Sequence, residues 1–290
     1  MKNYKLYAIF GSLFLFLLIV ISCGVVMNGE RTARIQVQIP MRPTMFPLSR
    51  PEIGNPMIAS DFSHTVGLTF DGKVFAVGKN SQGQLAVSEW TDIVDIAAGM
   101  SHTVGLKTDG TAVAVDSNTH GQLDISEWTD IVDISAGIYH TAGLKSDGTI
   151  VIAGGNIGNP FDVSDWTDIV AVYSGGHIIM GIKLDGTVLA TGFDDRYDVS
   201  GWTDIVAIAA GENYIVGLKS NGTVVADGHN GWGQLNVSDW RDMVAIDVGD
   251  YTTIGLKSDG TVVAVGQGEY VHNISVLKDI VAVSAGSSHR

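Results

Sequence analysis

The sequence predicts an all-β protein, a β-propeller of six recognisable repeats of about 38 residues plus a partial seventh, and therefore six or seven blades. Three observations predict this fold. A glycine pair and a tryptophan recur at a nearly constant spacing, and short runs rich in Val, Ile, Thr and Ala alternate with turn residues. No stretch of helical length shows a 3.6-residue period.

The repeat length is set by a Gly-Leu or Gly-Ile pair. Successive pairs lie 38, 38, 38, 36 and 38 residues apart and begin at Gly67, Gly105, Gly143, Gly181, Gly217 and Gly255. Five of the six tryptophans keep this spacing, with Leu277 in the sixth place: Trp90, Trp128, Trp166, Trp202 and Trp240. An Asp-Gly or Asn-Gly pair between two apolar runs favours a tight hairpin, because both residues tolerate positive φ. Each repeat is therefore predicted to be an antiparallel meander of three strands and a short fourth, the unit of a propeller blade.

The two ends of the repeat region duplicate one strand. Residues 283–289 match residues 96–102 and also residues 58–64. Three arrangements account for this: a six-bladed ring with overlapping ends, a partial seventh blade to which the alternating segment 34–39 adds a strand, or an array that continues beyond this sequence. We expect a ring sealed by terminal strands, because an open sheet edge invites aggregation.

Residues 1–22 are predicted to be an export signal that ends at a lipobox. Lys2 and Lys5 precede an apolar run that reaches Ile21, which is typical of a signal peptide. Residues 20–24 read Val-Ile-Ser-Cys-Gly and resemble the bacterial lipobox, which implies that Cys23 is diacylated and becomes the mature N-terminus. An uncleaved signal anchor is the alternative, since about 20 apolar residues span a bilayer. Both interpretations place the remainder of the chain outside the cytoplasm and on the membrane.

Charge and composition separate the next two segments. Residues 23–56 hold five of the six prolines and are predicted to form an extended spacer. Residues 57–290, the predicted propeller, carry 11 basic and 29 acidic residues. This balance argues against a nucleic-acid partner, because a phosphate backbone needs clustered Lys and Arg. A single cysteine excludes a disulfide framework.

Three short patterns resemble one repeat family. They are Asp-Gly-Thr-Val-x-Ala-x-Gly at residues 259–266, Asn-x-x-Gly-Gln-Leu at residues 80–85, and Ala-Gly-x-x-His at residues 98–102. Together they resemble the regulator of chromosome condensation repeat in its short bacterial form, across residues 57–290. The resemblance implies a propeller, usually of seven blades. The founding eukaryotic member of the family exchanges guanine nucleotide on a nuclear GTPase and binds chromatin, which conflicts with the export signal and the acidic charge here.

A comparison of the repeats with one another indicates where a partner would bind. The second and fourth connections of each repeat are nearly constant, whereas the first and third vary. In a meander the first and third connections lie on the same face, so we expect a variable binding face there. Its predicted partner-binding residues are aromatic anchors and acids: Tyr139, Tyr214, Trp232, Tyr251, Tyr270, Glu212 and Asp250. The acids favour a basic patch on a protein partner.

Several other site types are not supported by the residues. His64, His102, His140 and His289 share one repeat position but lie on different blades, so we expect each to make a hydrogen bond across its blade rather than to bind metal. No calcium loop of alternating aspartates, phosphate loop or nucleophile elbow occurs in the sequence. The sequence therefore predicts no catalytic residue, cofactor or metal.

These observations favour a membrane-anchored extracytoplasmic propeller that binds a protein in the envelope or secreted fraction and is not an enzyme. Secreted propellers with similar repeats include β-lactamase inhibitors, so an envelope enzyme inhibitor is one special case. Three alternatives stay open: an enzyme that acts on cell-wall polymer or polysaccharide, an exchange-like activity by family name only, and a structural or adhesive surface module. Several carboxylates around a pocket would favour the enzyme, and a uniformly polar loop face would favour the structural module.

Overall fold

The computed structural model describes residues 57–61, 64–155, 161–192, 197–267, 277–280, 282–283 and 285. These residues form six separate three-stranded antiparallel sheets, which we call blades 1 to 6. Blades 1 to 3 contain β1 (Met57–Asp61), β2 (His64–Leu68) and β3 (Val74–Gly78); β4 (Ile93–Ala98), β5 (His102–Lys107) and β6 (Ala112–Asp116); and β7 (Ile131–Ala136), β8 (His140–Lys145) and β9 (Ile150–Gly154). Blades 4 to 6 contain β10 (Ile169–Gly175), β11 (Ile178–Lys183) and β12 (Val188–Gly192); β13 (Ile205–Ala210), β14 (Tyr214–Lys219) and β15 (Val224–Gly228); and β16 (Met243–Val248), β17 (Thr252–Lys257) and β18 (Val262–Gly266).

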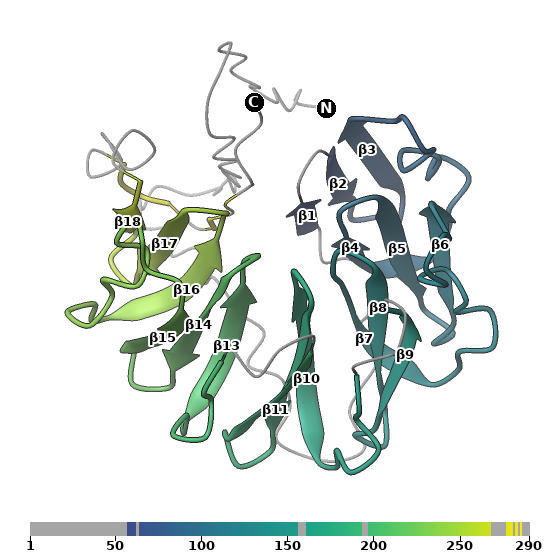
Figure 1. Ribbon diagram of the computed structural model, residues 1–290. Coiled ribbons are helices and arrows are strands. Elements are labelled where there is room, and N and C mark those ends of the chain that lie inside the picture. The colour runs from purple at the N-terminus through teal and green to yellow at the C-terminus, as the bar shows by residue number, and fades with distance from the viewer. Residues whose placement is uncertain are drawn as a thin grey trace, which may run out of the picture.

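The six blades follow one another around an axis, and the first strand of each blade lies innermost (Figure 1). Within each blade the strands pair in chain order, so the blade is a simple meander. The prediction of an all-β propeller with six repeats is confirmed. The expected short fourth strand is wrong: each of the six sheets described has three strands, and in blades 1, 2 and 5 residues 79–92, 117–130 and 229–242 form turns and bends instead. No helix of membrane-spanning length and hydropathy occurs in the described part of the chain.

The Asp-Gly hairpin forms as the sequence predicts. In blade 2, Gly110 has a φ of 81°, in the left-handed region that glycine adopts without strain. The Asp109 carboxylate accepts hydrogen bonds from the backbone N–H of Thr111 at 2.9 Å and from its hydroxyl at 2.6 Å. In blades 3 and 4 a threonine hydroxyl donates in the same way to Asp147 and Asp185. This hydrogen bond stabilises the ionised carboxylate and so lowers the pKa of both aspartates. The turn is therefore held by its own side chains.

The shared spacing of glycine and tryptophan has a steric cause. A Cβ built on Gly143 would lie 2.7 Å from Cζ3 of Trp128, and one built on Gly105 would lie 2.8 Å from Cζ3 of Trp90. Both distances are too short for a real contact, so each indole occupies the space that a side chain would need. Gly67 differs, because a Cβ there would meet nothing within 4 Å. The glycine and the tryptophan therefore recur together because the indole ring packs directly on the glycine backbone.

This packing predicts a contrast between two identical substitutions. Gly143→Ala is expected to lower the free energy of unfolding by about 1–3 kcal/mol, because an added methyl group must displace the Trp128 ring. Gly67→Ala is expected to change it by less than about 0.5 kcal/mol, since the site is open. Urea unfolding followed by tryptophan fluorescence measures both values. Equal effects at the two positions would contradict the indole packing.

Each blade is completed by the blade that follows it. Val113 and Val115 of β6 pack against a core of blade 1 that contains Val66, Leu68 and Val74. Outer-strand residues of blades 3 to 6 pack in the same way on the preceding core: Val151, Leu189, Val225 and Val263. The core is therefore a chain of interfaces between blades rather than one central cluster.

A seventh inner position follows blade 6. Ile280 is buried against Ile254, Leu256 and Val262, and its N–H donates to the carbonyl of Gly260 at 3.1 Å. The corresponding bond in blades 1 and 2 joins Ile93 N–H to Gly72 O at 3.3 Å. Residues 277–285, as far as they are described, therefore continue the repeat as the inner part of a seventh blade, in agreement with the predicted partial repeat.

Candidate functional site

The variable connections do lie on one face of the propeller. In blade 1, Asp61 pairs with His64 across the first connection, and His64 pairs with Gly78 where the third connection begins. The same register recurs in blade 2, where His102 pairs with Asp116. We call this end of the ring, which carries the first and third connections, the loop face. The Asp-Gly turns lie at the opposite end of the strands.

Two exposed aromatic rings meet on the loop face. Trp232, from the third connection of blade 5, is 50% exposed, and Tyr251, from the first connection of blade 6, is 37% exposed. Their ring centroids lie 6.0 Å apart with an interplanar angle of 64°, an edge-on contact. The loop that carries Trp232 is held by Gln234, whose side-chain oxygen accepts a hydrogen bond from the backbone N–H of Trp232 at 2.9 Å. The two rings thus form a fixed apolar surface that bridges two blades.

A second aromatic contact occupies the equivalent place between blades 2 and 3. His120 stacks on Tyr139 with centroids 4.2 Å apart and an interplanar angle of 29°. His177 of blade 4 lies 5.7 Å from the same tyrosine. His120 and Trp232 occupy the same repeat position, as do Tyr139 and Tyr251. Tyr139 is predicted from the sequence and the two histidines are not, because their only signal is their place in the same variable connections.

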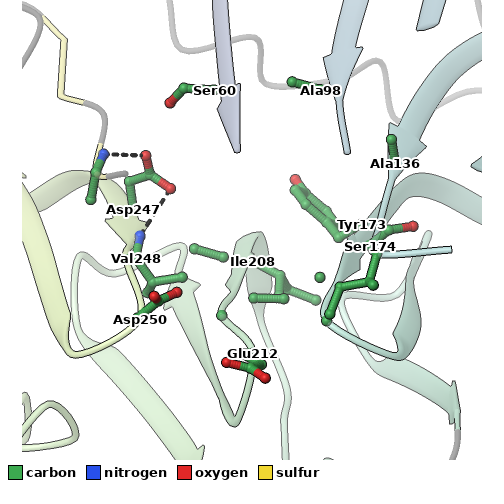
Figure 2. Close-up of a pocket in the computed structure, with 18 of the residues that line it drawn as sticks. Ser60, Ala98, Ala136, Tyr173, Ser174, Ile208, Glu212, Asp247, Val248 and Asp250 are labelled. Atoms are coloured by element: carbon green, nitrogen blue, oxygen red, sulfur yellow. Dashed lines mark hydrogen bonds between the residues drawn. The ribbon is translucent and has the colours of Figure 1, made fainter. Parts of the chain in front are cut away.

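A cavity of about 250 Å³ lies on the propeller axis. It exists because one repeat position holds a small residue in nearly every inner strand: Ser60, Ala98, Ala136, Ser174, Ala210, Val248 and Ala285. Figure 2 shows Tyr173, Ile208, Glu212 and Asp247 around this space. Glu212 is exposed and Asp250 is half-buried, and both come from first connections and line the cavity. The predicted acids of the loop face therefore gather at the cavity, together with Asp247, an inner-strand residue that the sequence does not reveal as a site residue.

Asp247 holds the seventh inner segment in place. Its Oδ2 accepts the N–H of Ala285 at 2.7 Å, and its Oδ1 accepts the N–H of Val248 at 2.9 Å. Both bonds are drawn in Figure 2. This carboxylate thus joins blade 6 to the segment that follows it.

The prediction that Tyr214 binds a partner is wrong. Its side chain is fully buried, and its hydroxyl lies 2.8 Å from the carbonyl oxygen of Gly249 and 2.7 Å from that of Thr252. Burial raises the pKa of the Tyr214 phenol. Tyr214 occupies the repeat position that holds histidine in blades 1 to 3, at the start of the second strand rather than in the connection itself. Its place in the repeat pattern, rather than its residue type, is the signal that identifies it as a core residue.

The histidines of that position are buried and join neighbouring blades. His64 Nε2 lies 2.9 Å from Thr103 Oγ1, and His102 Nε2 lies 3.0 Å from Thr141 Oγ1. The expected hydrogen bond is therefore present for these two residues, but it crosses to the next blade. Burial lowers the pKa of His64 and His102 to about 4 and that of His140 to about 3, because the charged imidazole loses its hydration.

Two predicted site residues, Cys23 and Tyr270, lie outside the described residues. Within the described residues, no group of three or more His, Cys, Asp or Glu side chains is arranged to hold a metal ion.

Comparisons with known proteins agree with this architecture. Residues 59–84 and 131–157 match the regulator of chromosome condensation (RCC1) repeat. The search of the curated proteins found no match. Among solved structures, the chain is similar to Prp20p from Saccharomyces cerevisiae, whose binding properties to Gsp1p and histones were described with its structure. The TM-score is 0.59 at 14% identity, with 80% of each chain covered.

The chain is also similar to human WBSCR16, with a TM-score of 0.59 at 14% identity, covering 82% of this chain and 83% of that one. The ectodomain of the receptor kinase CR4 from Physcomitrella patens gives a TM-score of 0.57 at 18% identity, covering 73% of this chain and 61% of that one. At these identities the likeness concerns the fold. Two segments of this chain, in blades 1 and 3, thus match the RCC1 repeat, and the likeness to yeast RCC1 shows that the chain shares its β-propeller fold.

Proposed function

We propose that this chain is a membrane-anchored extracytoplasmic propeller that binds a protein partner through its loop face and performs no catalysis. The observation that carries this proposal is the exposed contact between Trp232 and Tyr251. Large aromatic rings that are fixed before binding supply most of the affinity in many protein interfaces, since little side-chain entropy is lost.

Charge on the same face indicates what kind of partner fits. Glu212 is exposed at the first connection of blade 5, and Asp250 immediately precedes Tyr251. An aromatic patch bordered by carboxylates is complementary to a surface that presents an apolar pocket next to Lys or Arg. The proposed partner is therefore a protein with a basic patch.

The anchor is proposed from the N-terminal sequence. The basic residues, the apolar run and Cys23 support a lipidated N-terminus, and the Pro-rich residues 23–56 would hold the propeller away from the membrane. A partner would then belong to the envelope or secreted fraction. A single-pass signal anchor is the alternative form of attachment and gives the same location.

A second candidate function is favoured by one observation. Glu212, Asp247 and Asp250 line the same cavity, and paired carboxylates carry out glycoside hydrolysis. Both oxygens of Asp247, however, already accept backbone N–H groups, one from Val248 of the same strand and one from Ala285 of the seventh segment. This occupation favours binding over catalysis. Release of reducing sugar from cell-wall polymer by the full chain, lost in Glu212→Gln, would support the enzyme instead.

The binding proposal is tested with two matched variants. The full chain in detergent serves as bait in a crosslinking pull-down from envelope and secreted fractions. The double variant Trp232→Ala/Tyr251→Ala is expected to bind the captured protein at least about thirty-fold more weakly, the loss of about 2 kcal/mol typical of a hot spot. Phe70→Ala, which removes a 68% exposed ring from the Asp-Gly turn at the other end of the strands, is the control and is expected to bind normally.

Two outcomes would contradict the proposal. Capture of the same proteins by both variants would show that the loop face is not the binding surface. Capture of no protein by the native bait would direct attention to polysaccharide or to a structural role. Circular dichroism of each variant separates loss of binding from loss of fold.

A further inference from the structure

The connection that carries Trp232 contains an asparagine followed by a glycine. Asn230-Gly231 is one of two such pairs among the described residues, and the other, Asn221-Gly222, forms the tight turn of the same blade. An asparagine loses its amide when the next backbone nitrogen attacks the side-chain carbonyl carbon, which makes it a thermolabile residue. A following glycine favours the attack because it has no side chain to hinder it. Local geometry therefore decides which of the two pairs reacts.

An imidazole is placed at the attacking nitrogen of one pair. The backbone N–H of Gly231 is directed at Nδ1 of His229, with 3.5 Å between the two nitrogens. The side-chain oxygen of Gln234 accepts the N–H of Trp232, so its amide nitrogen is the atom that lies 3.2 Å from Nδ1 of His229. An amide nitrogen only donates, and Nδ1 therefore holds a lone pair. Such a nitrogen can take the Gly231 proton, and a contact of this length tightens as the proton moves.

The histidine and the glycine require each other. A Cβ built on Gly231 would lie 2.6 Å from Cε1 and 2.8 Å from Nε2 of His229, so only glycine leaves room for the imidazole. The backbone N–H of His229 donates to the carbonyl of Asn213 at 2.9 Å, which ties this residue to the first connection of the blade. His229 and Asn230 are both exposed, so water reaches them.

The equivalent loops of blades 1 and 2 share the asparagine but not its neighbours. Asn80, Asn118 and Asn230 each accept, through Oδ1, the backbone N–H of a leucine five residues later, at 3.1, 2.8 and 2.8 Å. This donor polarises the amide carbonyl and stabilises the negative oxygen that forms when a nitrogen attacks it. In blades 1 and 2 the next residues are Ser81 and Thr119, and no histidine precedes the asparagine. Of these three loops, only that of blade 5 combines the polarised amide with a glycine and a base.

We propose that Asn230 is a site of spontaneous deamidation in which His229 acts as the general base. Nδ1 of His229 takes the proton of the Gly231 nitrogen, and that nitrogen forms a bond to Cγ of Asn230. The bond from Cγ to Nδ2 then breaks, the proton passes to Nδ2, and ammonia leaves behind a cyclic imide. Water adds across one of the C–N bonds of the imide and opens it, which leaves aspartate or isoaspartate at position 230.

The two products differ in their effect on the loop face. Isoaspartate carries the main chain through its side chain, so an extra methylene enters the backbone close to Trp232 and displaces its contact with Tyr251. Aspartate keeps the main chain and adds a carboxylate to an acidic face. Isoaspartate is therefore expected to weaken partner binding and aspartate to preserve it. This consequence rests on the proposed function, whereas the reaction does not.

The test follows the full chain in detergent at neutral pH over time. Peptide mass spectrometry measures the conversion of each asparagine and separates isoaspartate from aspartate. Asn221 is the internal control, because it is exposed and precedes a glycine, but the Gly222 N–H donates to the carbonyl of Lys219 at 2.9 Å, which is not a base. Asn230 is expected to react at least about ten-fold faster than Asn221, at or below the low end of what a general base supplies.

Two further measurements assign the difference to the histidine. His229→Phe keeps a ring over Gly231 without a basic nitrogen, and it is expected to lower the rate at Asn230 to that at Asn221. Unfolding of the native chain in urea is expected to make the two rates equal, because the base is no longer held in place. A rate at Asn230 that does not exceed that at Asn221 in the folded chain, or an unchanged rate in His229→Phe, would overturn the proposal.

The effect on binding is measured separately with the captured partner. Asn230→Asp is the matched control, since it has the new charge and an unaltered main chain. The isoaspartate form is expected to bind about five-fold more weakly than Asn230→Asp, as for the loss of one aromatic contact. Equal binding of the two would overturn this consequence and the proposed role of Trp232, while the reaction at Asn230 is judged by mass spectrometry alone.

Discussion

Acidification from pH 7 to pH 4 is expected to lower the free energy of unfolding by about 3 kcal/mol for each of two buried histidines, His102 and His140. A histidine in the unfolded chain has a pKa near 6.5, whereas burial lowers the pKa of these two to about 4 and about 3. Between these values the unfolded state binds protons that the folded state does not. Stability is therefore complete above about pH 6.5 and is lost as the pH falls toward 4.

A loss of this size is a large part of the stability of a typical domain, about 5–15 kcal/mol in total. Urea unfolding at pH 7, 6, 5 and 4, followed by the fluorescence of the buried tryptophans, measures it. The window from pH 6.5 to 5 is the most informative, because the surface aspartates of the turns, whose pKa is lowered by threonine hydroxyls, remain ionised there.

His140→Ile provides the matched variant. The Nε2 atom of His140 is buried without a hydrogen-bond partner, and the next blade carries Ile178 at the same repeat position. The variant is expected to keep its stability at pH 7 and to exceed the native chain by about 3 kcal/mol at pH 4. An unchanged pH dependence in this variant would show that the histidine is not the group that titrates.

Asp116→Gly is expected to stabilise the protein by about 1–3 kcal/mol. Asp116 ends β6 with a φ of 104°, at a position that is glycine in the other five blades: Gly78, Gly154, Gly192, Gly228 and Gly266. Its two carboxylate oxygens are buried with no hydrogen-bond partner, and burial raises the pKa of the acid. Glycine removes both the backbone strain and the unpaired carboxylate, and these gains exceed its entropic cost of about 1 kcal/mol.

The reverse change supplies the control for this prediction. Gly154→Asp is expected to be strongly destabilising, because a Cβ at Gly154 would overlap the carbonyl oxygen of Tyr139. Thermal unfolding of both variants at pH 7 checks the pair. A lower melting temperature for Asp116→Gly would mean that the aspartate is held by a favourable interaction, and it would make this position a candidate for binding on the loop face.

The sequence predicts most of the fold because the repeat displays each constraint five or six times. The Asp-Gly turn and the paired glycine and tryptophan are local or pairwise packing requirements, so they appear directly as periodic residues. The bond from His64 to Thr103 is different, because its partners lie 39 residues apart and belong to different blades. The pattern of a single repeat therefore predicts that the hydrogen bond of such a histidine lies within its own blade.

The candidate site is predicted less completely for a related reason. Trp232 and Tyr251 are exposed because their repeat positions lie beyond the strand ends, whereas Tyr214 begins a strand and is buried. Residue type alone does not separate these cases. Tyr173 and Asp247 reach the axial cavity only because the surrounding positions are small, which depends on the ring and not on either residue.

The contacts between blades also bear on how such a ring can change during evolution. His64 of blade 1 is bonded to Thr103 of blade 2, so a polar side chain meets a polar one at that junction. At the junction of blades 3 and 4, His140 is followed by a blade that carries Ile179 at the threonine position, and its Nε2 has no hydrogen-bond partner. A second copy of blade 2 beside the original would keep a histidine against a threonine, whereas blade 5 moved to follow blade 1 would set His64 against Ile215. The junctions therefore allow some rearrangements of the repeats and penalise others.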